Sequence, residues 1–481
     1  MKLGNLKSNI IILSLAVLTL SSCKKWLEVQ PEDKFIKEQT YGSKTAIAEI
    51  VNGFYLTMGT DSLYGENLTL KTLDLFAQRY YQYSSSQTYY NYGNLDYTES
   101  NVKSNLQGIW TNMYSLIGNI NDFVSYLPQV NNTIISEADK NQYLGEAIGL
   151  RAFLHFDLLR MWGPVYNEAN KSQSAIPYYT SLGANIEDFS TAEQAATLIL
   201  KDIAEAETLL QNDPILTTSN ETSTTNSNNN RFNYYALIGL KARVYQWIGD
   251  KENALKAAQI VIAAQNKFPW TAYTDLYSST SPDRVFFKEN MFAIFNSSLY
   301  VNQTDLFDAS LFDSQILYTN PENDIFLTDS IFESNVSDYR MKQWTNSAVG
   351  SKKTFLKYEN ISSTTALQKY MIPLLRISEM YYIAAESTDD RTTALAYLNT
   401  VRAQRGLSNT LADSGTIMVD IPREIRKEYL KEFYGEGQLW YYYKRNQITN
   451  ILCPSGDATY HKTISASKFV FDIPDNESAG R

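Results

Sequence analysis

Hydrophobic residues recur at the three-and-four spacing of an amphipathic helix in several long stretches of the chain. The stretch 142–162 is the clearest of them, because its apolar residues continue until Gly163 and Pro164, which stop a helix. The same spacing predicts helices over four further ranges: 40–58, 105–127, 192–211 and 374–402. Part of 285–295 is typical of a strand, whereas 296–370 has little periodicity and predicts long irregular loops with short helices.

Residues 231–268 have the spacing of a tetratricopeptide repeat. Its small and aromatic positions fall on Ala242, Tyr245, Gly249 and Ala254. A small residue lets two helices approach closely, and the glycine permits the turn between them. Since a lone repeat cannot bury its own apolar face, the other predicted helices must pair with it. The pattern therefore predicts a mostly α fold, in which tetratricopeptide-like helix pairs form an α-superhelical scaffold with long irregular ligand-binding loops and little sheet.

One segment between the predicted helices has almost nothing to bury. Residues 217–230 are all Thr, Ser or Asn except Glu221, which predicts an exposed loop. Two interpretations stay open: a boundary between two halves, or an insertion in one body, since long surface loops cost little. We expect residues 23–481 to form a single globular body, with 23–216 and 269–481 as its halves.

The first residues have the pattern of an export signal. Lys2 and Lys7 precede an apolar run over residues 10–20, which is too short for the ~20 residues of a membrane-spanning helix. Ser21 and Ser22 then lead to Cys23, an ending that resembles a bacterial lipobox. The alternative is an ordinary signal peptide with a chance cysteine. Because the chain has only two cysteines, we favour removal of residues 1–22 and lipidation of Cys23, which leaves Cys453 as a packed or incidental thiol.

Charge and histidine content exclude several classes of function. The formal charge is −10, and removal of the two lysines in residues 1–22 leaves about −12, so nucleic acid is not an expected partner. His155 and His461 are the only histidines, which disfavours a His-ligated zinc site and a Ser-His-Asp triad. His155 lies in an apolar helical stretch and is expected to be packed. The sequence predicts no catalytic residue, no metal site and no cofactor.

Charged residues in the C-terminal half follow helical spacing. Glu428, Glu432 and Glu436 are four residues apart and are expected to line one helix face. Acid–base catalysis is one interpretation of such a row, but a paired or solvated face is more common and is the one we favour. Arg376 and Glu379 are three apart, which predicts a pair on one face of another helix.

Four motifs occur in order along the C-terminal third: LLRISEMYYIAAE at 374–386, ALAYLNTVRAQRG at 394–406, IRKEYLKEFYGEGQLW at 425–440 and FDIPDNE at 471–477. This succession resembles the C-terminal half of the SusD/RagB family. The lipobox-like start, the WLEV segment at 26–29 and the repeat at 231–268 fit the same family, so the resemblance covers essentially the whole mature chain.

The resemblance implies a function in nutrient capture. Family members are not enzymes; they bind nutrient oligomers, usually glycans, at the outer membrane, and act as a lid on a SusC-type TonB-dependent barrel transporter. The chain is accordingly expected to be lipid-anchored on the outer membrane facing the exterior, with that transporter and an oligosaccharide as partners. Three alternatives remain: a RagB-like peptide-binding protein, a repeat scaffold that binds only protein, and a glycoside hydrolase. A hydrolase would need two carboxylates roughly 5–10 Å apart in a cleft, and no pair stands out.

A tyrosine-rich segment is the main binding candidate. Seven of the residues 80–97 are Tyr, interspersed with Ser, Asn, Gln and Gly, a composition typical of flexible, adaptable binding surfaces. Tyr rings stack on the apolar faces of sugars, while amides and hydroxyls bind sugar hydroxyls. The candidates in and beside this segment are Asp74, Arg79, Tyr80, Tyr81, Tyr83, Tyr89, Tyr90 and Tyr92. The alternative is that these rings pack against the transporter or the repeat.

Other aromatic residues divide into surface and core candidates. Asn296 with Tyr300 is a second candidate binding surface, and Trp344 is a third. Trp270, Tyr273 and Tyr277 adjoin the repeat and are expected to pack under it. Three tryptophans on apolar helical faces are expected in the core: Trp110, Trp162 and Trp247.

Overall fold

The computed structural model describes residues 37–182, 186–217, 227–319, 325–345, 353–456, 459–475 and 477. The predicted signal segment and Cys23 lie outside these residues, as does most of the polar loop at 217–230.

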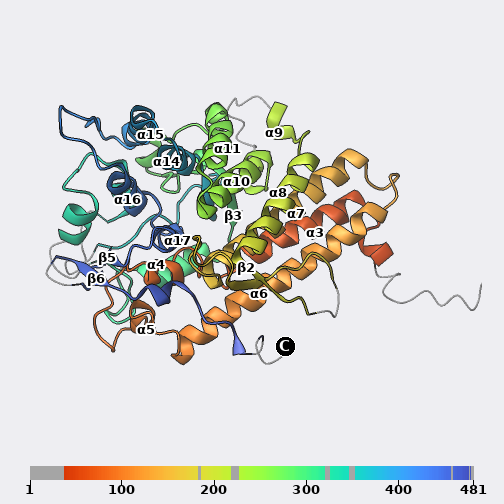
Figure 1. The fold of residues 1–481 in the computed structure, drawn as a ribbon, viewed down its shortest axis with the longest axis horizontal. Helices are drawn as coiled ribbons and strands as arrows, with labels where there is room; N and C mark the ends of the chain where they lie inside the picture. The colour runs from red at the N-terminus through yellow and green to blue at the C-terminus, as the bar shows by residue number, and fades with distance from the viewer. Residues whose placement is uncertain are drawn as a thin grey trace, which may run out of the picture.

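The described chain is mainly helical, as predicted. Its α-helices are α3 (Lys44–Met58), α4 (Thr72–Phe76), α5 (Tyr90–Gly93), α6 (Ser100–Tyr126), α7 (Glu137–Trp162), α8 (Ala192–Leu209), α9 (Pro214–Thr217), α10 (Tyr234–Ile248), α11 (Lys251–Ala263), α12 (Tyr273–Leu276), α13 (Leu299–Phe307), α14 (Ile377–Ser387), α15 (Arg391–Gln404), α16 (Ile421–Glu432) and α17 (Gln438–Arg445). Its strands are β1 (Ser174–Pro177), β2 (Phe189–Thr191), β3 (Asn290–Phe295), β4 (Met371–Arg376), β5 (Asn450–Leu452) and β6 (His461–Thr463). Figure 1 shows the long helices α3, α6, α7 and α8 side by side at one end and α14, α15 and α16 at the other, with α10 and α11 between the two groups.

The predicted repeat is the helix pair α10–α11. Asn233 caps α10 by accepting a hydrogen bond from Ala236 N, and α10 ends at Gly249, whose φ of +82° is the left-handed conformation that favours glycine. Ala242 and Ala254 are fully buried, as close packing of two helices requires. The pair continues on one side to α8 and α7 and on the other to α14 and α15, so the expected array of helix pairs is confirmed.

Within the described residues, sheet is limited to three antiparallel two-stranded pairs: β1–β2, β3–β4 and β5–β6. The strand predicted within 285–295 is β3, which pairs with β4 so that Ile294 faces Ile372. The helix predicted over 374–402 is wrong at its start, because 371–376 form β4 and the helix begins at Ile377. The pairing with β3 accounts for the difference, because it satisfies the backbone groups of 371–376 in a ladder with a segment about 80 residues earlier in the chain, which local helical spacing cannot show.

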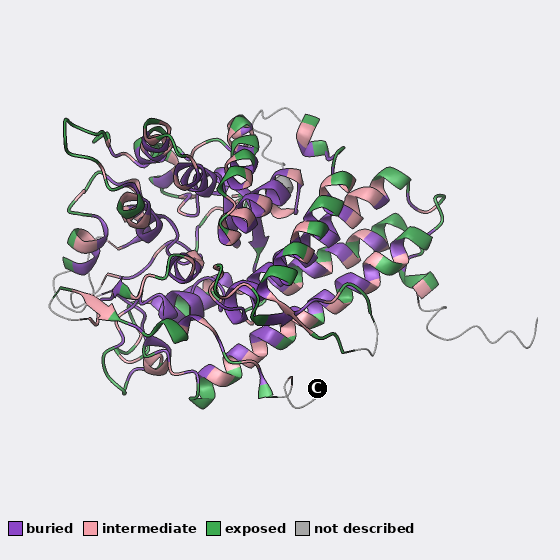
Figure 2. Cartoon of the chain, viewed as in Figure 1, coloured by how far each residue is buried: buried purple, intermediate pink, exposed green. Residues whose placement is uncertain are grey.

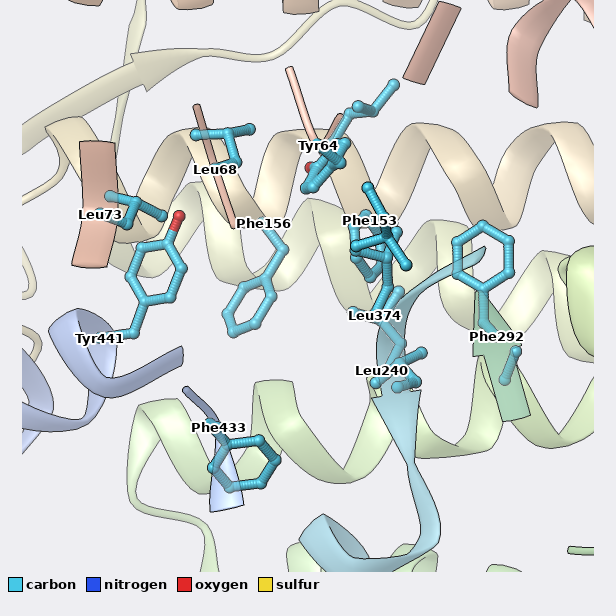
Figure 3. Packing of buried hydrophobic residues seen from close by; sticks show 14 of the residues in the cluster. Tyr64, Leu68, Leu73, Phe153, Phe156, Leu240, Phe292, Leu374, Phe433 and Tyr441 are labelled. Atoms are coloured by element: carbon cyan, nitrogen blue, oxygen red, sulfur yellow. The ribbon is translucent and has the colours of Figure 1, made fainter. Parts of the chain in front are cut away.

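Buried apolar side chains from both halves of the chain form one cluster. Figure 3 shows its centre, where Phe153 and Phe156 of α7 face Leu240, Phe292 and Leu374 from α10, β3 and β4. Figure 2 shows the inward faces of the helices buried and their outward faces exposed, the arrangement expected of amphipathic helices. Trp110, Trp162 and Trp247 are all buried in this cluster, as predicted.

His155 is a packed residue of α7, as predicted. Its ring stacks on Tyr178 with centroids 3.9 Å apart, its Nδ1 lies 3.0 Å from Arg151 O, and its Nε2 accepts a hydrogen bond from Tyr179 N. Burial lowers the pKa of His155 to about 3, so the ring is neutral at physiological pH. Cys453 is buried as well, and burial raises the pKa of its thiol.

Candidate functional site

The entrance of the tyrosine-rich segment is buried, which contradicts the prediction that its polar residues contact a ligand. Asp74 is fully buried and accepts a hydrogen bond from Gly435 N at 2.7 Å. The Arg79 guanidinium donates to Leu430 O at 2.6 Å and lies 3.9 Å from the centroid of the Tyr434 ring. Tyr80 is buried and donates to Leu70 O. Asp74 and Arg79 thus fasten the base of the segment to the region where α16 ends, and Tyr80 fastens it to Leu70, just before α4.

The segment beyond this base is held by hydrogen bonds, not left free as its composition suggested. The Gln87 amide oxygen accepts from Tyr83 N at 2.7 Å and from Ser84 N at 3.0 Å, while its nitrogen donates to Tyr81 O. Two backbone hydrogen bonds of 2.8 Å, Tyr81 N to Tyr318 O and Thr88 N to Ser314 O, join the segment to the loop at 308–318. Tyr81 and Tyr83 are therefore presented in fixed positions.

Three tyrosine rings form a stack at this place. The Tyr81 ring lies between Tyr83, at a centroid distance of 6.1 Å and 19° between planes, and Tyr318, at 5.7 Å and 30°. Exposure rises along the stack: Tyr318 is buried, Tyr81 is half-buried and Tyr83 is 71% exposed. Phe312, on the loop that carries Tyr318, is 77% exposed. We call Tyr81, Tyr83 and Tyr318 the tyrosine stack.

Sequence reasoning missed Tyr318 and Phe312. Their loop was predicted to be irregular and functional, but nothing in the sequence shows that it pairs with residues 81–88. The aromatic content of 296–370 was the available signal.

The remaining tyrosines of the segment contribute less surface. Tyr92 is buried, stacks on Phe76 and donates to Asn101 O, which contradicts its assignment as a ligand contact. Tyr89 is half-buried against Tyr92, and burial raises its pKa to about 12. Tyr90, in α5, is half-buried too.

The other two candidate binding surfaces, Trp344 and Asn296 with Tyr300, are largely covered by the protein itself. Trp344 is buried against Phe355 and Tyr434, so its prediction as a binding residue is wrong. Asn296 is buried and bonds Gly65 O and Ser298 N within the protein. Tyr300 is half-buried and packs on Tyr370, with centroids 4.4 Å apart.

The three spaced glutamates belong to a buried ionic network. Glu428 and Glu432 lie on α16, but the helix ends at Glu432, so Glu436 does not continue the predicted face. Arg405 and Arg340 donate to Glu432 at 2.6 and 3.0 Å, and Arg376 bonds both Glu432 and Glu436. Burial opposes ionisation of Glu432, yet Arg405 and Arg376 hold its pKa well below the usual value. The network is paired and structural, as we favoured.

The predicted pairing of Arg376 with Glu379 is wrong. Arg376 belongs to β4 and turns to Glu432 and Glu436, whereas Glu379 forms a buried two-pronged ion pair with Arg243 of α10. The strand at 371–376 places the two residues on different elements, so helical spacing does not apply.

Trp270 is half-buried beside Tyr381, while Tyr273 and Tyr277 lie on the surface, which contradicts their expected position under the repeat.

No group of three or more His, Cys, Asp or Glu side chains suited to a metal ion occurs among the described residues. In the same part of the chain, no helix combines the length and apolar character needed to cross a membrane.

Comparison with known families agrees with this fold. A family described as "Starch-binding associating with outer membrane" matches residues 25–245, and the SusD family matches residues 162–468. The second match spans more than half of the chain. The chain therefore belongs to the SusD family.

Individual relatives are distant in sequence and similar over most of their length. SusD-like protein P38 of Formosa agariphila is 25% identical, over 95% of this chain and 94% of that protein. A SusD superfamily structure from Bacteroides thetaiotaomicron has a TM-score of 0.71 at 19% identity, covering 91% of this chain and 98% of its own. Surface glycan-binding protein A from the same organism, solved with laminarihexaose, has a TM-score of 0.65 at 18% identity, with coverage of 91% and 98%. At such identities the two structures show the fold alone.

Proposed function

We propose that this protein is a lipid-anchored outer-membrane protein that captures oligosaccharides on the tyrosine stack. The observation that carries the proposal is the exposed Tyr83 ring, held nearly parallel to the ring beneath it. An aromatic face fixed by neighbours loses little freedom on binding, which favours affinity.

The surroundings of the stack suit a neutral, hydroxyl-rich ligand. Ser84, Ser85 and Ser86 are exposed beside Tyr83 and offer hydroxyls, whereas the tyrosine ring offers an apolar face. Sugar rings have the same two characters, apolar faces and hydroxyl edges. The laminarihexaose complex of a protein with this fold supports the same ligand class.

The same proposal includes the partners. We infer that lipid on Cys23 holds the protein on the outer face of the outer membrane, over a SusC-type TonB-dependent barrel transporter. The starch-binding, outer-membrane description of the family matching residues 25–245 supports this location. Binding without catalysis is favoured because the carboxylates that first suggested acid–base chemistry are occupied by arginines. A peptide ligand, as for RagB-like proteins, is the alternative that the test below separates.

The test is calorimetric titration of Tyr83 variants with laminarihexaose and a panel of neutral oligosaccharides and peptides. Truncating a central aromatic contact costs ~2 kcal/mol or more, so Tyr83→Ala should weaken oligosaccharide binding at least about tenfold. Tyr83→Phe keeps the ring and should retain most of the affinity. Tyr277→Ala removes an exposed ring elsewhere and serves as the control.

A stronger variant replaces Tyr81, Tyr83, Tyr89 and Tyr90 together with Ala. None of the four is fully buried, so folding should survive while oligosaccharide binding is lost. Unchanged oligosaccharide affinity, with reduced co-purification of the transporter, would reassign these rings to the protein partner. Affinity for peptides alone would establish the RagB-like alternative.

A further inference from the structure

A cavity of about 310 Å³ lies between α16, the π-helical segment Phe326–Ile331 and the β5–β6 hairpin. Its size falls at the lower end of small-molecule sites. Its walls combine apolar side chains, such as Leu430 and Ile451, with the polar Asn450 and Thr459. None of the binding candidates from the sequence belongs to it.

Two arginines distinguish this cavity from the rest of the molecule. Arg423 and Arg426 are one turn apart on α16 and both line it. Among the residues that the structure describes, neither guanidinium has an ion pair or a hydrogen bond, whereas Arg243, Arg340 and Arg376 are all paired with carboxylates. Arg423 is exposed and Arg426 half-buried, so both guanidinium groups are open to a solute that enters the cavity.

The acidic residues of the lining do not cancel them. Glu333 is bound by Lys427 at 2.7 Å and by Lys431 at 2.8 Å. Partial burial opposes its ionisation, but these two lysines lower its pKa to about 2, so it stays ionised and paired. Asp329 is exposed and accepts a hydrogen bond from Ser334 Oγ. Arg423, Arg426 and Lys427 therefore outnumber the two acids, and the lining carries a net positive charge.

The cavity and the tyrosine stack are connected through one element. Ser455 Oγ, in the loop of the β5–β6 hairpin, accepts a hydrogen bond of 2.7 Å from Gln82 N, and Gln82 lies between Tyr81 and Tyr83 in the sequence. On its other side the hairpin packs Tyr460 against Phe326 of the π-helical segment. The same hairpin therefore contacts the segment that carries Tyr81 and Tyr83 and forms a wall of the cavity.

We propose that this cavity is a subsite for the acidic group of an oligosaccharide, a uronate carboxylate or a sulfate ester, with Arg423 and Arg426 as its ligands. The planar guanidinium matches the paired oxygens of either anion, and such charge-assisted hydrogen bonds are stronger than neutral ones. The inference rests on the proposed glycan capture and adds to it: the tyrosine stack binds a sugar ring, and the cavity binds an acidic group carried by the same oligosaccharide.

The experiment compares wild type with the variant Arg423→Gln/Arg426→Gln in calorimetric titrations. The probes are an oligoglucuronate tetrasaccharide with its carboxyl-reduced form, a carrageenan tetrasaccharide with its desulfated form, and laminarihexaose. The two acidic probes separate a carboxylate ligand from a sulfate ligand. Lys201→Gln/Lys251→Gln is the matched control, because it removes the same charge from exposed positions on α8 and α11.

At least one acidic probe should bind wild type more tightly than its neutral form, with affinity that falls as salt rises. The arginine variant should lose that preference, about tenfold or more, and keep its affinity for neutral probes, while the lysine control should match wild type. Equal affinity of variant and wild type for every acidic probe overturns the subsite, as does the lack of any acidic preference in wild type. In either case, binding of neutral oligosaccharides that depends on Tyr83 would leave the proposed function intact. If no oligosaccharide binds wild type at all, both the acidic subsite and the proposed glycan capture are wrong.

Discussion

Asp74 is a buried carboxylate without a salt bridge among the described residues. Its Oδ2 accepts a hydrogen bond from Gly435 N, and its Oδ1 has no partner. Burial raises the pKa of Asp74 to about 7, although Arg79 acts in the opposite direction. In an unfolded chain this carboxyl titrates near its ordinary value of 3.8. Between these values the folded protein binds a proton that the unfolded chain releases, so Asp74 makes folding less favourable as pH rises from about 4 to about 7.

Asp74→Asn should remove this dependence. The amide oxygen can still accept from Gly435 N, but it has no charge to bury. The variant should match wild type near pH 4 and be more stable near pH 8, by at most about 4 kcal/mol from the pKa difference. Urea unfolding at several pH values measures the difference in the free energy of unfolding between variant and wild type. Asp389→Asn, at an exposed position, is the control. A variant less stable than wild type at pH 8 would show that the carboxylate is needed ionised.

Residue type alone was a poor guide to which individual side chains reach the surface. Polar Asp74 and Arg79 beside a tyrosine-rich segment suggested a surface site, yet their partners are Gly435 and Leu430, more than 350 positions away. Tyr81 and Tyr83 stay predicted ligand contacts: Tyr83 is exposed and Tyr81 half-buried, and their stack includes Tyr318, which the sequence did not indicate. Composition predicts that tyrosines gather, but not which of them the rest of the fold covers.

At the scale of elements, local sequence was a better guide. The pair α10–α11 follows from its alanines, its cap residues and Gly249, all within one short stretch. β4 and the ionic network could not be predicted from local sequence, because both depend on distant segments. Ile372 of β4 pairs with Ile294, and Glu432 pairs with Arg405 and Arg340. Helical spacing correctly put Glu428 and Glu432 on one helix, but it could not show their partners.

The close packing of the repeat gives a sharp test of its register. Ala242 is fully buried in α10, where a larger side chain would force neighbouring helices apart. We expect Ala242→Trp to destabilise the protein by at least about 3 kcal/mol, at the upper end of overpacking costs. Ala204→Trp, on an exposed position of α8, should change stability little. Equal melting temperatures of the two variants would contradict the assigned packing.

The network around Glu432 gives a second test. Glu432→Gln removes one negative charge from the buried network and leaves Arg376, Arg405 and Arg340 without it. Breaking a buried ion pair in this way costs about 3–5 kcal/mol. Glu252→Gln breaks an exposed pair with Lys256, which solvent screens, and should leave stability almost unchanged. Denaturant unfolding of both variants makes the comparison. Oligosaccharide affinity of folded Glu432→Gln should stay unchanged, whereas a specific loss of binding would give Glu432 a role beyond stability.

At the scale of the whole molecule, the C-terminal region packs against the end of α7 in the N-terminal half. Lys444 of α17 donates to Met161 O and Gly163 O at the end of α7, and Trp162 Nε1 donates to Asp472 O. Burial lowers the pKa of Lys444 well below its usual value, so these two carbonyls solvate an amine that is held away from water. We propose that the two halves fold as one unit for this reason. The sequence motifs near the C-terminus thus complete a core begun by the N-terminal helices.

The anchor is the remaining property of the whole protein, and its two cysteines provide a matched experiment. If Cys23 carries the lipid, Cys23→Ala should move the expressed protein from the membrane fraction to the soluble fraction, since the processed chain then has no acyl group to insert. Cys453→Ala is the control, because Cys453 is buried and its loss should leave attachment unchanged. Fractionation with immunoblotting, and mass measurement of the mature N-terminus, report the outcome. Cys23→Ala protein that stays with the membrane as fully as wild type would mean that attachment depends on other contacts, with the transporter as the first candidate.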